Sequence, residues 1–207
     1  MLRKISMATI LVGFTLSNFA EARSLTLEER AAVYESYAWE AKASYDLAAQ
    51  KMNAAYQANS SDFFVNLRMG WLFSLAKKYK NSVDHYEAAA KIAPLSIDPW
   101  LGLSLLYLNL GETDRSLSAS EQLLTRDPAN YYGLLRTNMA LIKSKRYSEA
   151  LSRVDQALKV YPVDPTFLEQ KGFLLVSIGK AEEAREPLSL LLLISPQNAY
   201  AKSILKN

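Results

Sequence analysis

The sequence predicts an all-α protein in which antiparallel helix pairs stack into a solenoid. Prolines recur at a constant interval, at Pro94, Pro128, Pro162 and Pro196. Compact residues precede these prolines by 24 places, at Gly70, Ser104, Asn138 and Gly172. Apolar residues precede them by five places, at Ala89, Leu123, Ala157 and Leu191. Such a fixed period indicates stacked repeats rather than one globular core. The sequence has no alternating β-branched run that would predict a sheet.

The units resemble the tetratricopeptide repeat, whose pattern is W-x2-L-G-x2-Y, then A-x3-F, then P, with the same period as the prolines. The clearest unit has Met69, Gly70 and Phe73 in the Leu, Gly and Tyr places, followed by Tyr86 and Pro94. The resemblance implies a right-handed α-solenoid of about five repeats. We expect a degenerate repeat at 25–62, further repeats at 63–96, 97–130, 131–164 and 165–198, and a short capping helix at 199–207.

Local sequence signals predict the helix ends. Thr26 and Glu29 have the spacing of a capping box. Three Asp-Pro pairs predict an N-cap followed by proline at the first helical position: Asp98-Pro99, Asp127-Pro128 and Asp164-Pro165. Gly111 and Gly179 are expected to end the first helices of two units.

The last unit breaks the pattern. Pro187 falls inside its expected second helix, so we expect a kink there. The residues at 188–194 are apolar on nearly every side, and terminal repeats need a covering element. Tyr200, Ile204 and Leu205 have the spacing to cover this surface. The alternative is a dimer contact, which would make the C-terminal end a site of self-association.

The N-terminal residues predict export. Arg3 and Lys4 precede an apolar stretch from Ile5 to Phe19, and Ala20-Glu21-Ala22 fits a cleavage site. We therefore expect a cleaved signal peptide at 1–22 and a periplasmic or otherwise exported protein. The alternative is an uncleaved N-terminal anchor. The chain has no cysteine, which excludes disulfides, a lipidated cysteine and thiol catalysis.

The charge pattern is a weaker guide. The net charge is +3, and two basic turns, at 77–80 and 143–146, lie near equivalent places two repeats apart. They fit either a phosphate-binding strip or solvated turns. We favour solvated turns, because the intervening turn is acidic and export separates the protein from nucleic acid. No nucleic-acid partner is expected.

The resemblance implies a concave groove lined by the first helix of each repeat, which receives a partner segment. The groove is predicted to contain Tyr34, Tyr37, Phe64, Arg68, Trp71, Leu105, Tyr132, Arg136, Met139 and Phe173, with Leu67, Leu101, Leu135 and Gln170 beside them. Aromatic and arginine side chains are frequent anchors of interfaces. The two arginines are expected to bind carboxylates or backbone carbonyls of a peptide. Leu67, Leu101 and Leu135 fit inter-helix packing better.

Catalysis finds no support in the sequence. His85 is the only histidine and falls on an expected second helix, away from the groove. Neither a cysteine and histidine metal cluster nor a nucleotide-binding glycine loop is present, so we expect no enzyme and no cofactor. The lysine and asparagine clamp by which some family members bind chaperone tails is also absent. The predicted function is an adaptor that binds a protein or peptide segment of a bacterial envelope complex. The alternative is a scaffold that contacts polysaccharide during envelope export or assembly.

Overall fold

The computed structural model describes residues 25–206, which contain twelve helices and no strand. The helices are α1 (Leu27–Ala41), α2 (Tyr45–Lys51), α3 (Asn53–Ala58), α4 (Phe63–Leu75), α5 (Tyr79–Ile92), α6 (Asp98–Leu110), α7 (Thr113–Arg126), α8 (Tyr131–Lys143), α9 (Tyr147–Val160), α10 (Pro165–Ser177), α11 (Arg185–Ile194) and α12 (Ala199–Leu205). The predicted signal peptide at 1–22 lies outside the described residues. Between residues 25 and 206, no helix is both long enough and apolar enough to cross a membrane.

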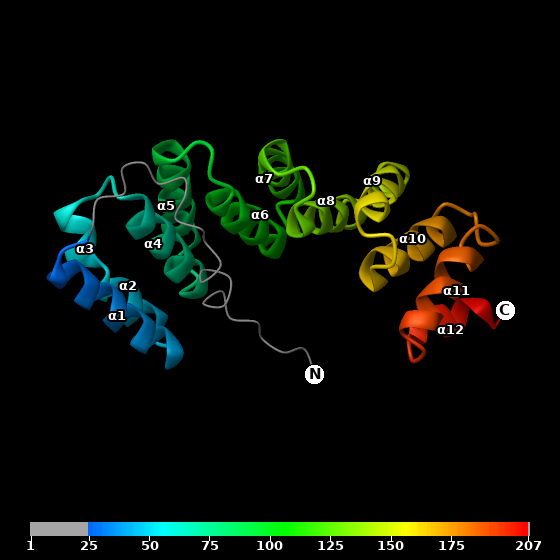
Figure 1. Ribbon diagram of the computed structural model, residues 1–207, viewed down its shortest axis with the longest axis horizontal. Coiled ribbons are helices and arrows are strands. Elements are labelled where there is room, and N and C mark those ends of the chain that lie inside the picture. Colours follow the sequence, from blue (N-terminus) through cyan, green and yellow to red (C-terminus); the bar gives the residue numbers. More distant parts are fainter. Residues whose placement is uncertain (1–24, 207) are drawn as a thin grey trace.

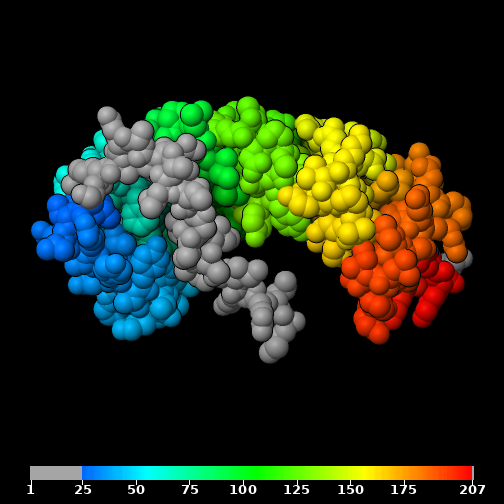
Figure 2. Space-filling model, viewed as in Figure 1, coloured from blue at the N-terminus to red at the C-terminus, as the bar shows by residue number. Residues whose placement is uncertain are grey.

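The helices form successive antiparallel pairs, as the sequence predicts. In Figure 1 the pairs follow one another along an arch, with α5, α7 and α9 on its outer side and α6 and α8 nearer its inner side. Figure 2 shows the same curvature from the N-terminal to the C-terminal end of the described chain. In the first pair, the second helix is divided into α2 and α3. The fold is therefore an α-solenoid, in which each unit packs on its neighbours.

A left-handed residue joins the two helices of every pair. Among residues 25–206, the five residues with positive φ are Ala43 (55°), Lys77 (59°), Gly111 (77°), Lys145 (59°) and Gly179 (81°). They recur with the same period as the prolines, so the first pair has the same phase as the other four. Only two of them are glycine, the residue that adopts this conformation at little cost. Gly111 is the C-cap of α6, as expected, and Gly179 is the left-handed residue directly after Ile178, the C-cap of α10.

Lys145→Gly is expected to stabilise the protein. A non-glycine residue in the left-handed region costs about 1–2 kcal/mol, of which the greater flexibility of glycine in the unfolded chain offsets a part. The net gain should be about 0.5–1 kcal/mol in the free energy of unfolding, measured by urea denaturation. Gly111→Ala, which introduces the same strain into an equivalent turn, should lose about as much. A destabilised Lys145→Gly variant would contradict this account.

The recurring prolines lie just after the second helix of each of the last four units. The residues that precede them are Ala93, Asp127, Tyr161 and Ser195, with φ between −126° and −138° and ψ between 70° and 87°. Proline disfavours the helical conformation in the residue before it, so each proline ends a helix at the same place. This steric effect gives the second helices of the last four units the same end point.

The predicted N-caps are partly confirmed. Thr26 forms its capping box with Glu29, and Asp164 accepts from Thr166 and Phe167. The Asp127-Pro128 prediction is wrong, because α7 ends at Arg126 and the N-cap of α8 is Asn130. The Asp98 prediction is displaced by one residue, since α6 already includes Asp98 and its N-cap is Ile97.

The expected kink at Pro187 is absent. A turn occupies residues 181–184, and α11 begins only at Arg185. Pro187 therefore lies in the first turn of α11, where the backbone N–H that proline lacks would have no partner within the helix. The cost of proline is avoided by shortening the helix rather than by bending it.

The apolar run of α11 packs under the last helix. Leu188 and Leu191 are buried together with Ala201 of α12. Tyr200, Ile204 and Leu205 pack against the same cluster from α12. All three residues therefore cover the apolar surface of α11, as the sequence predicts. Leu193 of α11 remains exposed.

Candidate interaction groove and the junctions behind it

Exposed and half-buried apolar side chains recur along the first helices, of which α6 and α8 lie nearer the inner side of the arch (Figure 1), and we call them the inner row. Tyr132 and Met139 on α8 are 36% and 40% exposed. Half-buried groove residues continue this row on the other first helices: Phe64, Leu67 and Trp71 on α4, Leu105 on α6, Leu135 on α8 and Phe173 on α10. This row fits an apolar segment better than a charged one, because it offers aromatic and aliphatic surface at low conformational cost.

The C-terminal end of this row opens into a pocket of about 560 Å³. Its walls come from α8, α10, α12 and the segment before α12: Ile142, Pro165, Thr166, Glu169, Gln170, Phe173, Ser195, Asn198 and Tyr200. The Phe173 and Tyr200 rings lie 6.3 Å apart. Asn198 donates a hydrogen bond of 2.7 Å to Glu169. Burial, and secondarily the charge of Glu169, raises the pKa of Tyr200.

Sequence reasoning missed most of this pocket. Glu169 and Ile142 lie on first helices, but neither residue type stands out among the aromatic candidates. Tyr200 is predicted for the capping surface alone. The available signal was Glu169, which occupies the same repeat position as Leu67 and Leu135.

Arg68 does not project into the groove as predicted. It is only 4% exposed and forms an ion pair with Glu40 of the preceding unit. Its Nε donates to Ser36 at 3.2 Å, and its guanidinium lies 3.8 Å from the centre of the Tyr37 ring. Glu40 also accepts a hydrogen bond of 2.8 Å from the Trp71 indole. These contacts join the first two units.

Arg136 occupies the equivalent place between the third and fourth units and is 8% exposed. Its Nη1 donates to the backbone oxygen of Leu101 and, at 2.9 Å, to the hydroxyl of Ser104. Burial lowers the pKa of Arg136 to about 10, so the guanidinium remains charged at neutral pH. The predicted use of both arginines as ligands for a partner is corrected, because both guanidinium groups are buried and bonded to the preceding unit.

The junction between the second and third units is filled by an aromatic ring instead. Gly70 and Gly102 flank Tyr86, which is 1% exposed. A Cβ atom on Gly102 would lie 2.3 Å from the Tyr86 ring, and one on Gly70 would lie 2.8 Å from it. The compact residue predicted where paired helices approach is confirmed at Gly70.

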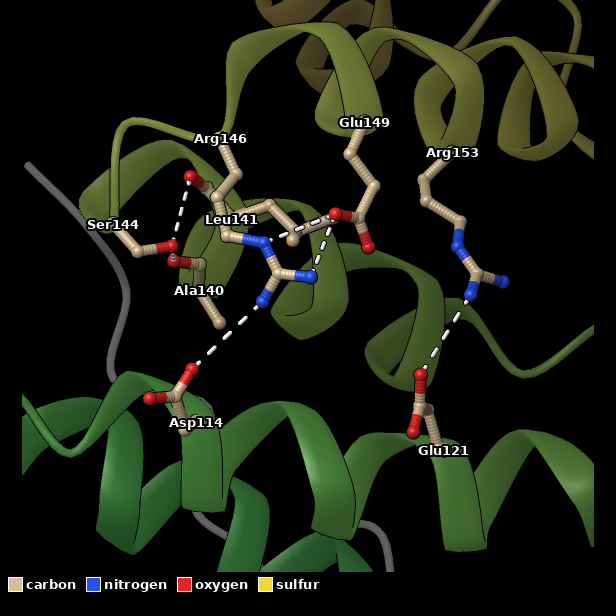
Figure 3. A network of polar contacts seen from close by, with 8 residues as sticks. All are labelled: Asp114, Glu121, Ala140, Leu141, Ser144, Arg146, Glu149 and Arg153. Carbon is tan, nitrogen blue, oxygen red and sulfur yellow. Dashed lines mark hydrogen bonds and ion pairs between the residues drawn. The ribbon is translucent and has the colours of Figure 1, made fainter.

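The basic turns are paired with acidic residues. Arg146 contacts Glu149 at 2.6 Å and Asp114 of the preceding unit at 3.8 Å, and Arg153 contacts Glu121 at 3.7 Å (Figure 3). In the other basic turn, Lys78 contacts Asp46 at 2.7 Å. These ion pairs between units favour the interpretation of both turns as solvated structural turns.

His85 lies on the second helix α5, as expected, and is half buried. Its Nδ1 is 2.9 Å from the Asn66 side-chain oxygen, and its ring stacks on Phe73 with centroids 5.4 Å apart. Burial lowers the pKa of His85, so this ring is neutral at pH 7. Over residues 25–206, no group of three or more histidine, cysteine, aspartate or glutamate residues has an arrangement suited to a metal ion.

A curved stack of helix pairs with an apolar inner row defines a helical-repeat protein. Residues 97–130 match the family profile of the tetratricopeptide repeat. The chain thus contains a tetratricopeptide repeat, and its other helix pairs share the period and arrangement of that unit.

Among curated proteins, the chain is similar to Protein CTR9 homolog of Arabidopsis thaliana, with 27% identity over 126 residues, which are 60% of this chain and 12% of that protein. It is also similar to TPR repeat-containing protein YsoA of Bacillus subtilis, with 30% identity over 84 residues, which are 40% of this chain and 25% of that protein. The chain therefore spans a quarter or less of the length of these two relatives.

Solved structures share the fold along most of the chain. A tetratricopeptide repeat protein from Parabacteroides merdae superposes with a TM-score of 0.75 at 19% identity, covering 86% of this chain and 71% of that one. MamA from Desulfovibrio magneticus superposes with a TM-score of 0.74 at 13% identity, covering 85% of this chain and 99% of that one. At these identities, the similarity shows a common architecture.

Proposed function

We propose that the protein is a non-catalytic protein–protein interaction scaffold of the bacterial cell envelope, which binds an apolar peptide segment along the inner row. The observation that carries this proposal is the exposure of Tyr132 and Met139 on α8, a helix that also contributes Ile142 to the pocket of about 560 Å³. The envelope location rests on the sequence pattern of residues 1–22, which fits a signal peptide.

The junction contacts make this binding mainly apolar. Arg68 and Arg136 are held by the preceding units, which leaves Tyr132, Met139, Phe64 and Phe173 as the candidate anchors. Burial of such side chains is worth about 25 cal/mol per Å² of apolar area. Partner binding should therefore depend little on salt, unlike binding through exposed ion pairs.

Tyr132→Ala is the variant that best tests this proposal. Tyr79→Ala is its matched control, because Tyr79 is 37% exposed, against 36% for Tyr132, but belongs to the second helix α5. A photoactivatable amino acid at Met139 should cross-link one defined protein in intact cells. Tyr132→Ala should reduce that yield at least tenfold, since an interface aromatic that anchors binding contributes about 2 kcal/mol or more, and Tyr79→Ala should leave it unchanged.

Two results would contradict the proposal. One is equal cross-linking in Tyr132→Ala and Tyr79→Ala. The other is cross-linking to polysaccharide without protein, which would favour the scaffold for polysaccharide export instead. Trp71→Ala and Arg136→Glu are less suitable variants, because both residues hold neighbouring units together.

A further inference from the structure

The first helix of the stack has an open face. In every later unit, the equivalent face of the first helix is covered by the preceding unit. In the later first helices, the preceding unit buries the third and tenth repeat positions, which are Val65 and Leu72, Pro99 and Leu106, Gly133 and Ala140, and Phe167 and Leu174. The equivalent residues of α1, Ala31 and Ala38, are exposed. Tyr34, at the position of Arg68 and Arg136, is 72% exposed. Tyr34 is predicted in the groove, but its repeat position places it on this open end.

The open face of α1 is a continuous apolar stripe. Its exposed members are Leu27, Ala31, Tyr34, Ala38 and Ala41. They are spaced alternately by four and three residues, which is the pattern of a helix that packs on another helix. Terminal units of a solenoid need a polar outer face to remain soluble. An apolar face in this place marks an interaction surface.

We propose that α1 packs antiparallel against α1 of a second copy of this chain, around a two-fold axis close to Tyr34. Up to residue 206, the C-terminal end of the stack has no free apolar surface of the kind on which α1 could pack. There, α12 already covers Leu188 and Leu191 of α11 with Ala201, which is the surface that a following unit would use. Head-to-tail stacking is therefore blocked, whereas pairing of α1 with itself closes into a dimer.

The sizes of the stripe residues and the charges at the two ends of α1 favour the antiparallel arrangement. Glu35, beside the axis, is paired with Lys51 of its own chain at 2.7 Å. Alanines at three of the five stripe positions let the two backbones approach, while Leu27 and Tyr34 supply the bulk. Glu28 at one end of α1 and Lys42 just after its other end are both exposed. In an antiparallel pair, each Glu28 lies near the partner's Lys42, and the two helix dipoles oppose each other. A parallel pair would instead bring like charges together.

Sedimentation velocity of the protein with its native N-terminus tests the dimer. We expect a concentration-dependent dimer that Tyr34→Glu weakens at least tenfold, since it places two carboxylates near the axis. Leu95→Glu is the control, because Leu95 is 88% exposed in the loop between α5 and α6. Circular dichroism should show equal helicity in both variants. A monomer at about 100 µM, a concentration at which even a weak interface is populated, would overturn the proposal and indicate another cover for α1, such as residues 1–22.

Cross-linking tests the direction of the helices. The chain has no cysteine, so single substitutions give unique sites. Leu27 and Ala41 are 14 positions apart, or about 21 Å along the helix. A short bismaleimide should join a mixture of Leu27→Cys and Ala41→Cys chains to each other, and should join Leu27→Cys chains to themselves far less. Equal yields in the mixture and in Leu27→Cys alone would overturn the antiparallel pairing.

Discussion

Arg68→Ala is expected to lower the free energy of unfolding by about 3–5 kcal/mol, the usual loss when one partner of a buried ion pair is removed. The variant leaves the carboxylate of Glu40 without its guanidinium. It also removes the donor to Ser36 and the cation over the Tyr37 ring. Urea denaturation followed by far-UV circular dichroism would measure the loss of stability. Unfolding should begin in the first two units, because the contacts of Arg68 join them.

A matched arginine separates this effect from general loss of charge. Arg153 also pairs with an acidic residue of the preceding unit, Glu121, but at 3.7 Å and in a solvent-accessible place. Arg153→Ala should therefore cost less than about 1 kcal/mol. Equal losses in the two variants would mean that Arg68 contributes little to the junction. A double-mutant cycle of Arg68 with Glu40 would then show no coupling.

The stacking of helix pairs was predictable because residues with the same structural role recur at the same places in successive repeats. In the last four units, a proline ends the second helix by acting on the residue before it, and this effect is local enough to be read from sequence. The apolar positions of the second helices were equally clear. Ala89, Leu123, Ala157 and Leu191 are all fully buried.

The division of the first helices between groove and junction was not predictable from periodicity alone. Adjacent repeat positions differ by only about 100° around a helix, so Arg68 and Leu67 lie on neighbouring faces. Which face meets the preceding unit depends on how the units rotate relative to one another. A usable signal was the serine that stands at the same offset before each arginine, Ser36 for Arg68 and Ser104 for Arg136. Both pairs form hydrogen bonds between neighbouring units at this offset.

The predictions of an N-cap at Asp127 and of a kink at Pro187 were wrong, because neither took account of where the second helix of the repeat begins or ends. Asp127-Pro128 resembles Asp164-Pro165 in sequence, but Pro128 is one of the recurring prolines that follow a second helix. Asp127 therefore caps the C-terminal end of α7. Pro187 is expected in a helix interior because the repeat length predicts a full second helix, whereas α11 has only ten residues.

Gly102→Ala is expected to destabilise the protein by up to about 3 kcal/mol, the upper range for overpacking a filled core. The added methyl group would lie 2.3 Å from the Tyr86 ring. That ring cannot move away easily, since a Cβ atom at Gly70 would also be in close contact with it. Because α6 carries Gly102 and α5 carries Tyr86, the strain acts between the second and third units. Thermal and urea denaturation would both detect it.

Tyr86→Leu provides the compensating change. Alone, it should cost about 1–3 kcal/mol, because it leaves a cavity between two glycines. In the double variant, the methyl group of Gly102→Ala refills part of this cavity, and no ring remains for it to clash with. The double variant should therefore lose less than the sum of the single losses, with a coupling of about 0.5 kcal/mol or more. Simple additivity would show that the ring does not limit the approach of these two units. The presence of an aromatic junction between the two arginine junctions would then need another cause.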